Sequence, residues 1–197
     1  ADRWAETMTT NVIGTFYMSN AVGPHMIQNG FGRIVNVSTS DRSMIREMNS
    51  PYGASKAALE AMSVAWSKEA AHHGVTVNVL LPGGATQTRM VTGVSQRTPL
   101  PPEIMNPAIL WLCADESSGY TGGRYKADDW DTEADPDTAA LGARQLISRS
   151  LRELQNPLNM VIGGASCSRG PRVAAALSGS RGAALPCAAA GTLFGAP

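Results

Sequence analysis

The fold is decided by residues 32–84, GRIVNVSTSDRSMIREMNSPYGASKAALEAMSVAWSKEAAHHGVTVNVLLPGG. The segment opens with a short β-branched run at 33–38, which is typical of a buried strand. A helix is predicted over 51–73, because a proline stands in its first turn and Gly74 follows its last residue. A second β-branched run at 75–81 predicts another buried strand. This order favours a parallel pair of strands joined by a helical crossover.

The same alternation continues on both sides of this unit. Apolar residues at helical spacing predict a helix over 4–28 before it and a helix over 102–114 after it. A short strand is predicted at 123–127, followed by a helix over 134–154. The chain is therefore expected to be an α/β protein with a partial Rossmann-like, doubly wound parallel sheet.

Composition divides the chain into three parts. Residues 1–131 have the pattern of an ordinary globular domain, and residues 132–155 form an extension that the last predicted helix would occupy. The segment 156–197 is dominated by Ala, Gly, Ser and Pro and has no acidic residue. Because alanine buries little apolar area, this low-complexity tail is expected to be disordered. An extension past the true end of the gene is the alternative.

Charge and cysteine content exclude several classes of function. Lys and Arg number 16, as do Asp and Glu, so the formal net charge is zero. This balance argues against nucleic acid or an acidic membrane surface as a partner. Neither a signal peptide nor a membrane-spanning run is expected. The three cysteines form neither a disulfide framework nor a metal site, and no other metal site is expected, so a cytoplasmic location is predicted.

A tyrosine and a lysine stand four residues apart in the predicted helix over 51–73, at Tyr52 and Lys56. This spacing places both side chains on one face of the helix, one turn apart. A free tyrosine has a pKa of about 10, which an ammonium group in a partly dry cleft lowers. Tyr52 is therefore a candidate to give a proton to a ketone or to take one from an alcohol. An ordinary pair on the surface of an amphipathic helix is the alternative.

The Tyr52-x-x-x-Lys56 pattern, with the strand Gly32–Ser38 before it, resembles the short-chain dehydrogenase/reductase family. Three further segments agree with the family in its order along the chain. They resemble the helix that carries the family's catalytic Asn, the strand and Pro-Gly turn beside the nicotinamide, and the approach to the last strand: Asn11–Phe16, Val77–Gly83 and Ala114–Gly123. The resemblance covers about residues 1–131.

The resemblance implies a role for four residues in interconverting an alcohol and a ketone by hydride transfer. Tyr52 would be the general acid/base, and Lys56 would lower its pKa and hold the ribose hydroxyls of the cofactor. Asn11 would bend its helix and support a water in a proton relay. Thr39 stands where the family has the hydroxyl, usually Ser, that binds the substrate oxygen, and Ser40 is the alternative.

The resemblance also implies a nicotinamide cofactor, either NAD or NADP, and a small alcohol or carbonyl compound as substrate. Pro82 and Gly83 would lie beside the nicotinamide. Thr88 would hold its carboxamide, with Thr86 as a rival because the spacing from Gly83 is longer by one residue than usual. The loop 90–100 would be the substrate lid.

One departure from the family is large. The family begins with a strand, a Gly-rich turn and a helix that bind the cofactor pyrophosphate, and none of these is present in the sequence. The sequence thus favours the catalytic C-terminal part of such an enzyme. An inactive partial fold that acts as a binding or oligomerisation module is the alternative. Homo-oligomers are expected to form through the helices over 4–28 and 51–73.

Overall fold

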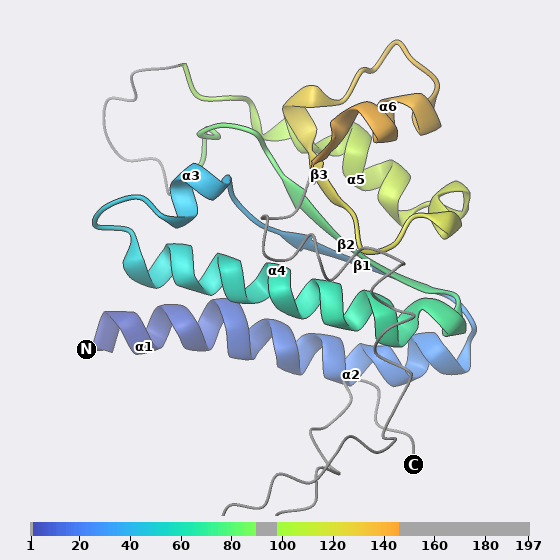
Figure 1. Ribbon diagram of the computed structural model, residues 1–197, viewed down its shortest axis with the longest axis horizontal. Helices are drawn as coiled ribbons and strands as arrows, with labels where there is room; N and C mark the ends of the chain where they lie inside the picture. The colour runs from blue at the N-terminus through green and yellow to red at the C-terminus, as the bar shows by residue number, and fades with distance from the viewer. Residues whose placement is uncertain (1, 90–97, 146–197) are drawn as a thin grey trace, which may run out of the picture.

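The protein is described by a computed structural model that covers residues 2–89 and 98–145 (Figure 1). Its centre is a four-stranded sheet in the order β1-β2-β3-β4. The strands β1 (Gly32–Val37), β2 (Val75–Leu81) and β3 (Arg124–Lys126) are parallel, and β4 (Arg144–Gln145) is antiparallel to β3. The predicted α/β class and the three predicted strands are confirmed.

The N-terminal helix runs over the predicted 4–28 segment but contains a turn of a different type. Helix α1 (Asp2–Met8) passes into a π-helical turn, η1 (Thr9–Ile13), and then into α2 (Gly14–Gln28). The amide of Gly14 donates to the carbonyl of Thr9, five residues back, as a π-helix requires. The irregularity expected near Asn11 is therefore present.

The crossover from β1 to β2 is made by a short helix and a long one. Helix α3 (Asp41–Met44) follows β1, and α4 (Ser50–Ala70) begins with Pro51 in its first turn, as predicted. The long helix ends in a 3₁₀ turn, η2 (Ala71–His73), and a left-handed Gly74 with φ of 71°. A side chain at Gly74 would also collide with the carbonyl oxygen of Gly30.

Two layers of helices bury the two faces of the sheet, and side chains alternate between them along each strand. One face packs against α4 through Ile34, Val77, Trp66 and their neighbours. The other face packs Leu80 and Tyr125 against α5 (Asn106–Cys113). In Figure 1, α1, α2 and α4 lie together on one side of the sheet and α5 lies on the other.

The C-terminal part of the described chain differs from the prediction in one element. The segment predicted as a helix over 102–114 is a 3₁₀ turn, η3 (Pro102–Met105), followed by α5. The helix predicted over 134–154 is confirmed near its start, where α6 spans Pro136–Ala143, but its predicted end is wrong. Arg144 has extended backbone angles of φ −71° and ψ 122°, and it pairs with Tyr125 to begin β4. The remaining turns are η4 (Asp115–Gly119) and η5 (Ala127–Asp129).

Several predictions lie partly or wholly outside the described residues. These are most of the expected lid at 90–100, residues 146–154 of the expected last helix, and the tail at 156–197. Within residues 2–89 and 98–145, no helix has both the length and the hydropathy to cross a bilayer. The same residues contain no cluster of metal-ligating side chains, and their cysteine, Cys113, is a free and exposed thiol.

Candidate active site

A cavity of about 490 Å³ opens at the carboxyl ends of β1 and β2, where a parallel sheet offers its ligand site. Seven of the residues singled out in the sequence, alternatives included, line this one cavity. They come from the loop after β1, the first turn of α4 and the loop after β2: Thr39, Ser40, Tyr52, Pro82, Gly83, Thr86 and Thr88. Two other predicted residues, Lys56 and Asn11, lie behind this lining.

Lys56 lies one helical turn behind Tyr52 on α4. Its Nζ atom is 5.8 Å from the centroid of the Tyr52 ring, and it donates a hydrogen bond of 2.9 Å to the carbonyl oxygen of Val37. Burial lowers the pKa of Lys56 below its ordinary value, because a charged ammonium group is poorly solvated there. The two groups therefore point to the same side of the fold, and the amine joins the helix to the end of β1.

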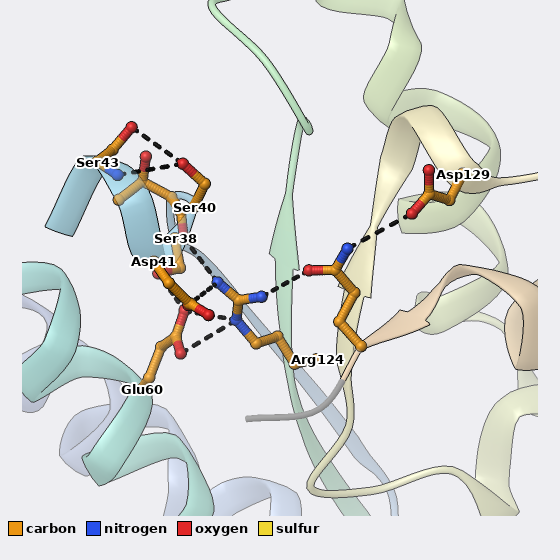
Figure 2. Close-up of polar contacts among 9 residues, drawn as sticks. Ser38, Ser40, Asp41, Ser43, Glu60, Arg124 and Asp129 are labelled. Carbon is orange, nitrogen blue, oxygen red and sulfur yellow. Dashed lines mark hydrogen bonds and ion pairs between the residues drawn. The ribbon is translucent and has the colours of Figure 1, made fainter. Parts of the chain in front are cut away.

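The three hydroxyl residues after β1 have different partners. Ser38 is buried and donates a 2.6 Å hydrogen bond to Glu60 Oε1. Ser40 caps α3, because its hydroxyl accepts from the amide of Ser43 and also bonds the Ser43 hydroxyl (Figure 2). The Thr39 hydroxyl has no hydrogen bond to another residue in the described part of the chain. Among these three residues, Thr39 is thus the one whose hydroxyl has free bonding capacity.

Asn11 contacts α4 from the π-helical turn. Its Nδ2 atom donates a 3.0 Å hydrogen bond to Ser55 Oγ, and Ser55 Oγ donates to the carbonyl oxygen of Tyr52 at 2.8 Å. The carbonyl oxygen of Asn11 accepts a hydrogen bond from Thr15 Oγ1. Asn11 therefore does not line the cavity, but it is connected through Ser55 to the backbone of Tyr52.

The opposite wall of the cavity is the turn after β2. Gly83 has φ of 104°, and a Cβ atom there would collide with the carboxylate of Asp128. The amide of Asp128 donates to the carbonyl of Pro82 at 3.1 Å, which fixes the turn against η5. Thr86 is half-buried and Thr88 is exposed, and both line the cavity. The glycine at position 83 therefore lets the Pro82-Gly83 turn pack closely against η5.

Sequence reasoning missed a buried polar network that adjoins the cavity. It connects Arg124 on β3 with Glu60 on α4 and with Asp41, the first residue of α3 (Figure 2). Arg124 also bonds Gln145 on β4. A signal for one member was available, because Glu60 stands four residues after Lys56 on the face of the helix that also holds Tyr52. A second signal is Arg124, a charged residue in the short buried strand β3.

Comparisons with known proteins identify the family of the chain. Residues 1–99 match the family model described as short chain dehydrogenase. An acetoacetyl-CoA reductase from Allochromatium vinosum is 28% identical over 130 residues, which are 60% of this chain and 53% of the relative. A 3-oxoacyl-[acyl-carrier-protein] reductase from Thermotoga maritima is 34% identical over 131 residues, with coverages of 60% and 53%.

A solved structure gives the same result for the fold. A protein from Beutenbergia cavernae that is described as an NAD(P)-dependent gluconate 5-dehydrogenase, with NADP bound at low occupancy, aligns with a TM-score of 0.56 at 26% identity. The alignment covers 61% of this chain and 54% of the other. The chain thus spans about half the length of the proteins that it matches.

Proposed function

The chain belongs to the short-chain dehydrogenase family, and from this premise we propose that it forms the catalytic portion of an NAD(P)-dependent oxidoreductase. The proposed reaction interconverts a small-molecule alcohol and the corresponding ketone. The observation that carries the proposal is that Tyr52 lines the cavity beyond the carboxyl ends of two parallel strands, with Lys56 Nζ 5.8 Å from the centroid of its ring.

Tyr52 is proposed as the general acid/base. When a ketone is reduced, its oxygen takes the phenolic proton of Tyr52, and in the reverse direction the phenolate takes the proton of the alcohol. Lys56 supports the phenolate, because its ammonium group lies close to the Tyr52 ring in a partly buried position where charges interact strongly. Asn11 is proposed to support this proton path through Ser55 and the carbonyl of Tyr52.

Thr39 is proposed to donate a hydrogen bond to the substrate oxygen. Its side chain faces the cavity that Tyr52 also lines, and it has no competing partner among the described residues. The alternative donor, Ser40, already uses its hydroxyl to cap α3. A donor that is held in place before the substrate arrives stabilises the charge that develops on the oxygen during reduction.

The residues present fit a nicotinamide cofactor, either NAD or NADP. When bound, the cofactor supplies or accepts the hydride. The Pro82-Gly83 turn lines the cavity, and it is held against η5 because Gly83 leaves room for Asp128 and the Asp128 amide bonds the Pro82 carbonyl. Thr88, or its rival Thr86, offers a hydroxyl for the carboxamide, and Lys56 offers donors for the ribose hydroxyls.

The proposed division of the chain gives the catalytic portion to residues 1–131 and an extension to residues 132–155. Strand β1 is an edge of the described sheet, so its outer backbone groups are free to pair with a further strand. A second cavity, of about 560 Å³, lies beside this edge between α2 and β1, lined by residues such as Met18, Val22 and Ile34. The β1 edge and this cavity could therefore pack against the cofactor-binding half of the family fold.

The open edge also supports a second candidate function, a binding or oligomerisation module without activity of its own. Large apolar side chains are also exposed on α1 and α2, among them Trp4, Tyr17 and Met18, and Met18 lines the cavity beside the edge. We also propose homo-oligomers through the α1–α2 and α4 helices, where Ala57 and Ala61 are exposed and would allow close packing. A cytoplasmic location is proposed with them, supported by the free thiol of Cys113.

The test uses the protein expressed from its complete open reading frame. Thermal unfolding is followed with NADH and NADPH, and reduction is assayed with a panel of carbonyl compounds that includes acetoacetyl-CoA. We expect cofactor to raise the Tm, and Tyr52→Phe to lower kcat by about 10³-fold while the Tm shift is retained. Tyr17→Phe, on an exposed part of α2, is the matched control.

Two outcomes contradict the proposal in different ways. A cooperative melt that does not respond to about millimolar cofactor, together with no reduction of any compound, favours the module instead. Full activity of the Tyr52→Phe variant would leave the family assignment intact but would remove Tyr52 from the acid/base role. Analytical ultracentrifugation at micromolar concentration tests the proposed oligomer, and a monomer alone would contradict it.

A further inference from the structure

Arg124 of β3 is an arginine whose three side-chain nitrogen atoms all donate hydrogen bonds, although its side chain is only 2% exposed. Its Nε atom donates to both carboxylate oxygens of Glu60, at 3.0 and 3.1 Å. Its Nη1 atom donates to Gln145 Oε1 at 2.7 Å. Its Nη2 atom donates to the carbonyl oxygen of Thr39 at 2.9 Å and to Asp41 Oδ1 at 2.8 Å. A buried guanidinium is tolerated only when its donors are satisfied in this way.

The ion pair connects the two elements that carry the proposed chemistry. Glu60 lies on α4 two turns after Tyr52 and one turn after Lys56, so it belongs to the same face of the helix. Its carboxylate also accepts a 2.6 Å hydrogen bond from Ser38 at the end of β1 (Figure 2). The pair therefore fixes the distance between α4 and the loop that follows β1.

The segment after β1 is held through the Ser38 side chain, the Thr39 carbonyl and the Asp41 side chain, around the free side chain of Thr39. Ser38 is bonded to Glu60, the carbonyl of Thr39 is bonded to Arg124, and Asp41 is bonded to Arg124. Ser40 is committed to capping α3. Because the Thr39 carbonyl and both neighbouring residues are bonded, Thr39 has little freedom to change its backbone angles. The contacts of Arg124 and Glu60 therefore determine where the Thr39 hydroxyl lies.

We propose that Arg124, together with Glu60, is a positioning residue that sets the Thr39 hydroxyl relative to Tyr52. The inference rests on the proposed function, since Thr39 and Tyr52 are its substrate-binding hydroxyl and its acid/base. A displacement of about 1 Å at a reacting group can cost about 10²-fold in rate. A buried ion pair by itself contributes little net stability, so a role in stability alone explains this network poorly.

The experiment combines Arg124→Lys with Thr39→Val in the protein expressed from its complete open reading frame. Arg124→Lys keeps the charge but cannot make the forked contacts to Glu60 and to the loop. We expect it to lower kcat by about 10- to 100-fold and to change the KM for cofactor by less than about threefold. In the Thr39→Val background the same substitution should lower kcat by less than about threefold, because the group it positions is gone.

Arg33→Lys is the matched control. Arg33 lies at the start of β1, where it bonds the carbonyl of Ala114 and the hydroxyl of Ser118, at the opposite end of the strand from the cavity. Its replacement should lower the Tm without a selective loss of kcat, and equally in both backgrounds. If Arg124→Lys does not fold, Glu60→Gln, which keeps an acceptor for Ser38, carries the same comparison.

The positioning role has a second measurement that does not need activity. Amide hydrogen exchange over residues 38–44 should be at least about tenfold faster in Arg124→Lys than in Arg33→Lys. Unchanged exchange there, or an equal loss of kcat with and without the Thr39 hydroxyl, overturns the proposal. If the unsubstituted protein reduces nothing and Tyr52→Phe changes nothing, the proposed function fails instead, and hydrogen exchange still decides whether Arg124 orders the loop.

Discussion

The ammonium group of Lys56 donates a 2.9 Å hydrogen bond to the carbonyl oxygen of Val37, the last residue of β1. Lys56 lies on α4, the helix that carries Tyr52. Val37 immediately precedes the loop of Ser38, Thr39 and Ser40. Burial of Lys56 accompanies this contact and lowers its pKa. The hydrogen bond to β1 therefore holds the amine at the proposed site, although the buried ammonium group loses solvation free energy. The effect of this loss on the stability of the fold can be measured.

The first prediction concerns the pH dependence of stability in Lys56→Met. Between the lowered pKa of Lys56 in the fold and its ordinary value of 10.5, the unfolded chain binds this proton and the folded chain does not. The free energy of unfolding of the unsubstituted protein should therefore rise with pH through this window relative to Lys56→Met. Urea unfolding of both proteins from neutral pH to about pH 10.5 measures the difference. Parallel curves would contradict the burial of the amine.

The second prediction separates Thr39 from Ser40. Thr39→Val removes the free hydroxyl and should lower kcat by about 10²-fold, whereas Thr39→Ser should retain most activity. Ser40→Ala removes the cap of α3 and should lower the free energy of unfolding by about 1 kcal/mol, with a smaller change in kcat. Steady-state kinetics and urea melts of the three variants test this contrast. A larger loss of kcat in Ser40→Ala than in Thr39→Val would exchange the two roles.

The third prediction concerns Tyr125, whose buried hydroxyl has no hydrogen-bond partner among the described residues. Tyr125→Phe should raise the free energy of unfolding by about 1 kcal/mol, because an unsatisfied polar group is removed. Burial also raises the pKa of Tyr125, so the free energy of unfolding of the unsubstituted protein should fall as the pH rises above 10. The decrease that comes from the titration of Tyr125 should be absent in the Tyr125→Phe variant.

Tyr120→Phe is the control for this prediction, because the exposed Tyr120 hydroxyl bonds Asp137 Oδ1 at 2.9 Å. It should not stabilise the protein. Thermal and urea melts between neutral pH and about pH 11 compare the two variants. Destabilisation by Tyr125→Phe at neutral pH would show that the hydroxyl makes a favourable contact.

The fourth prediction concerns Gly53, next to Tyr52 on α4. A Cβ atom there would collide with the carbonyl of Met44, the last residue of α3, so Gly53→Ala must push α3 away from α4. We expect a loss of about 1–3 kcal/mol in the free energy of unfolding and a higher KM for substrate, since the loop before α3 lines the cavity.

Gly142→Ala on α6 is the matched control, because nothing lies within 4 Å of the Cβ position there. It should stabilise the protein by up to about 1 kcal/mol, as alanine normally does in a helix. Equal effects of the two substitutions in urea melts would contradict the close contact between α3 and α4.

The sequence predicted most of the elements, because their signals are local. The β-branched run at 75–81 and the proline and glycine at the two ends of α4 determine those elements within a few residues. The end of α6 was predicted wrongly, since Arg144 leaves the helix to pair with Tyr125, a contact that local helix propensity does not contain.

The residues of the proposed site that belong to one sequence motif could be predicted. The residues that come together only through contacts between distant parts of the sequence could not. The four-residue spacing of Tyr52 and Lys56 could be seen in one segment. The contact between Arg124 and Glu60 joins residues 64 positions apart, and that between Asn11 and Ser55 spans 44. No periodicity within a single element indicates such pairs, which become visible only when β3 lies beside β2 and α4 covers both.

The two edge strands of the described sheet differ in length, and this difference determines on which side another strand can be added. Within residues 2–89 and 98–145, the β4 margin is two residues long, which is too short to template another strand, whereas β1 on the other side is six residues long. Growth of the described sheet is therefore favoured outward from β1. If two copies met through that margin, each would cover the other's long described edge, so the product would be a closed pair rather than a fibre.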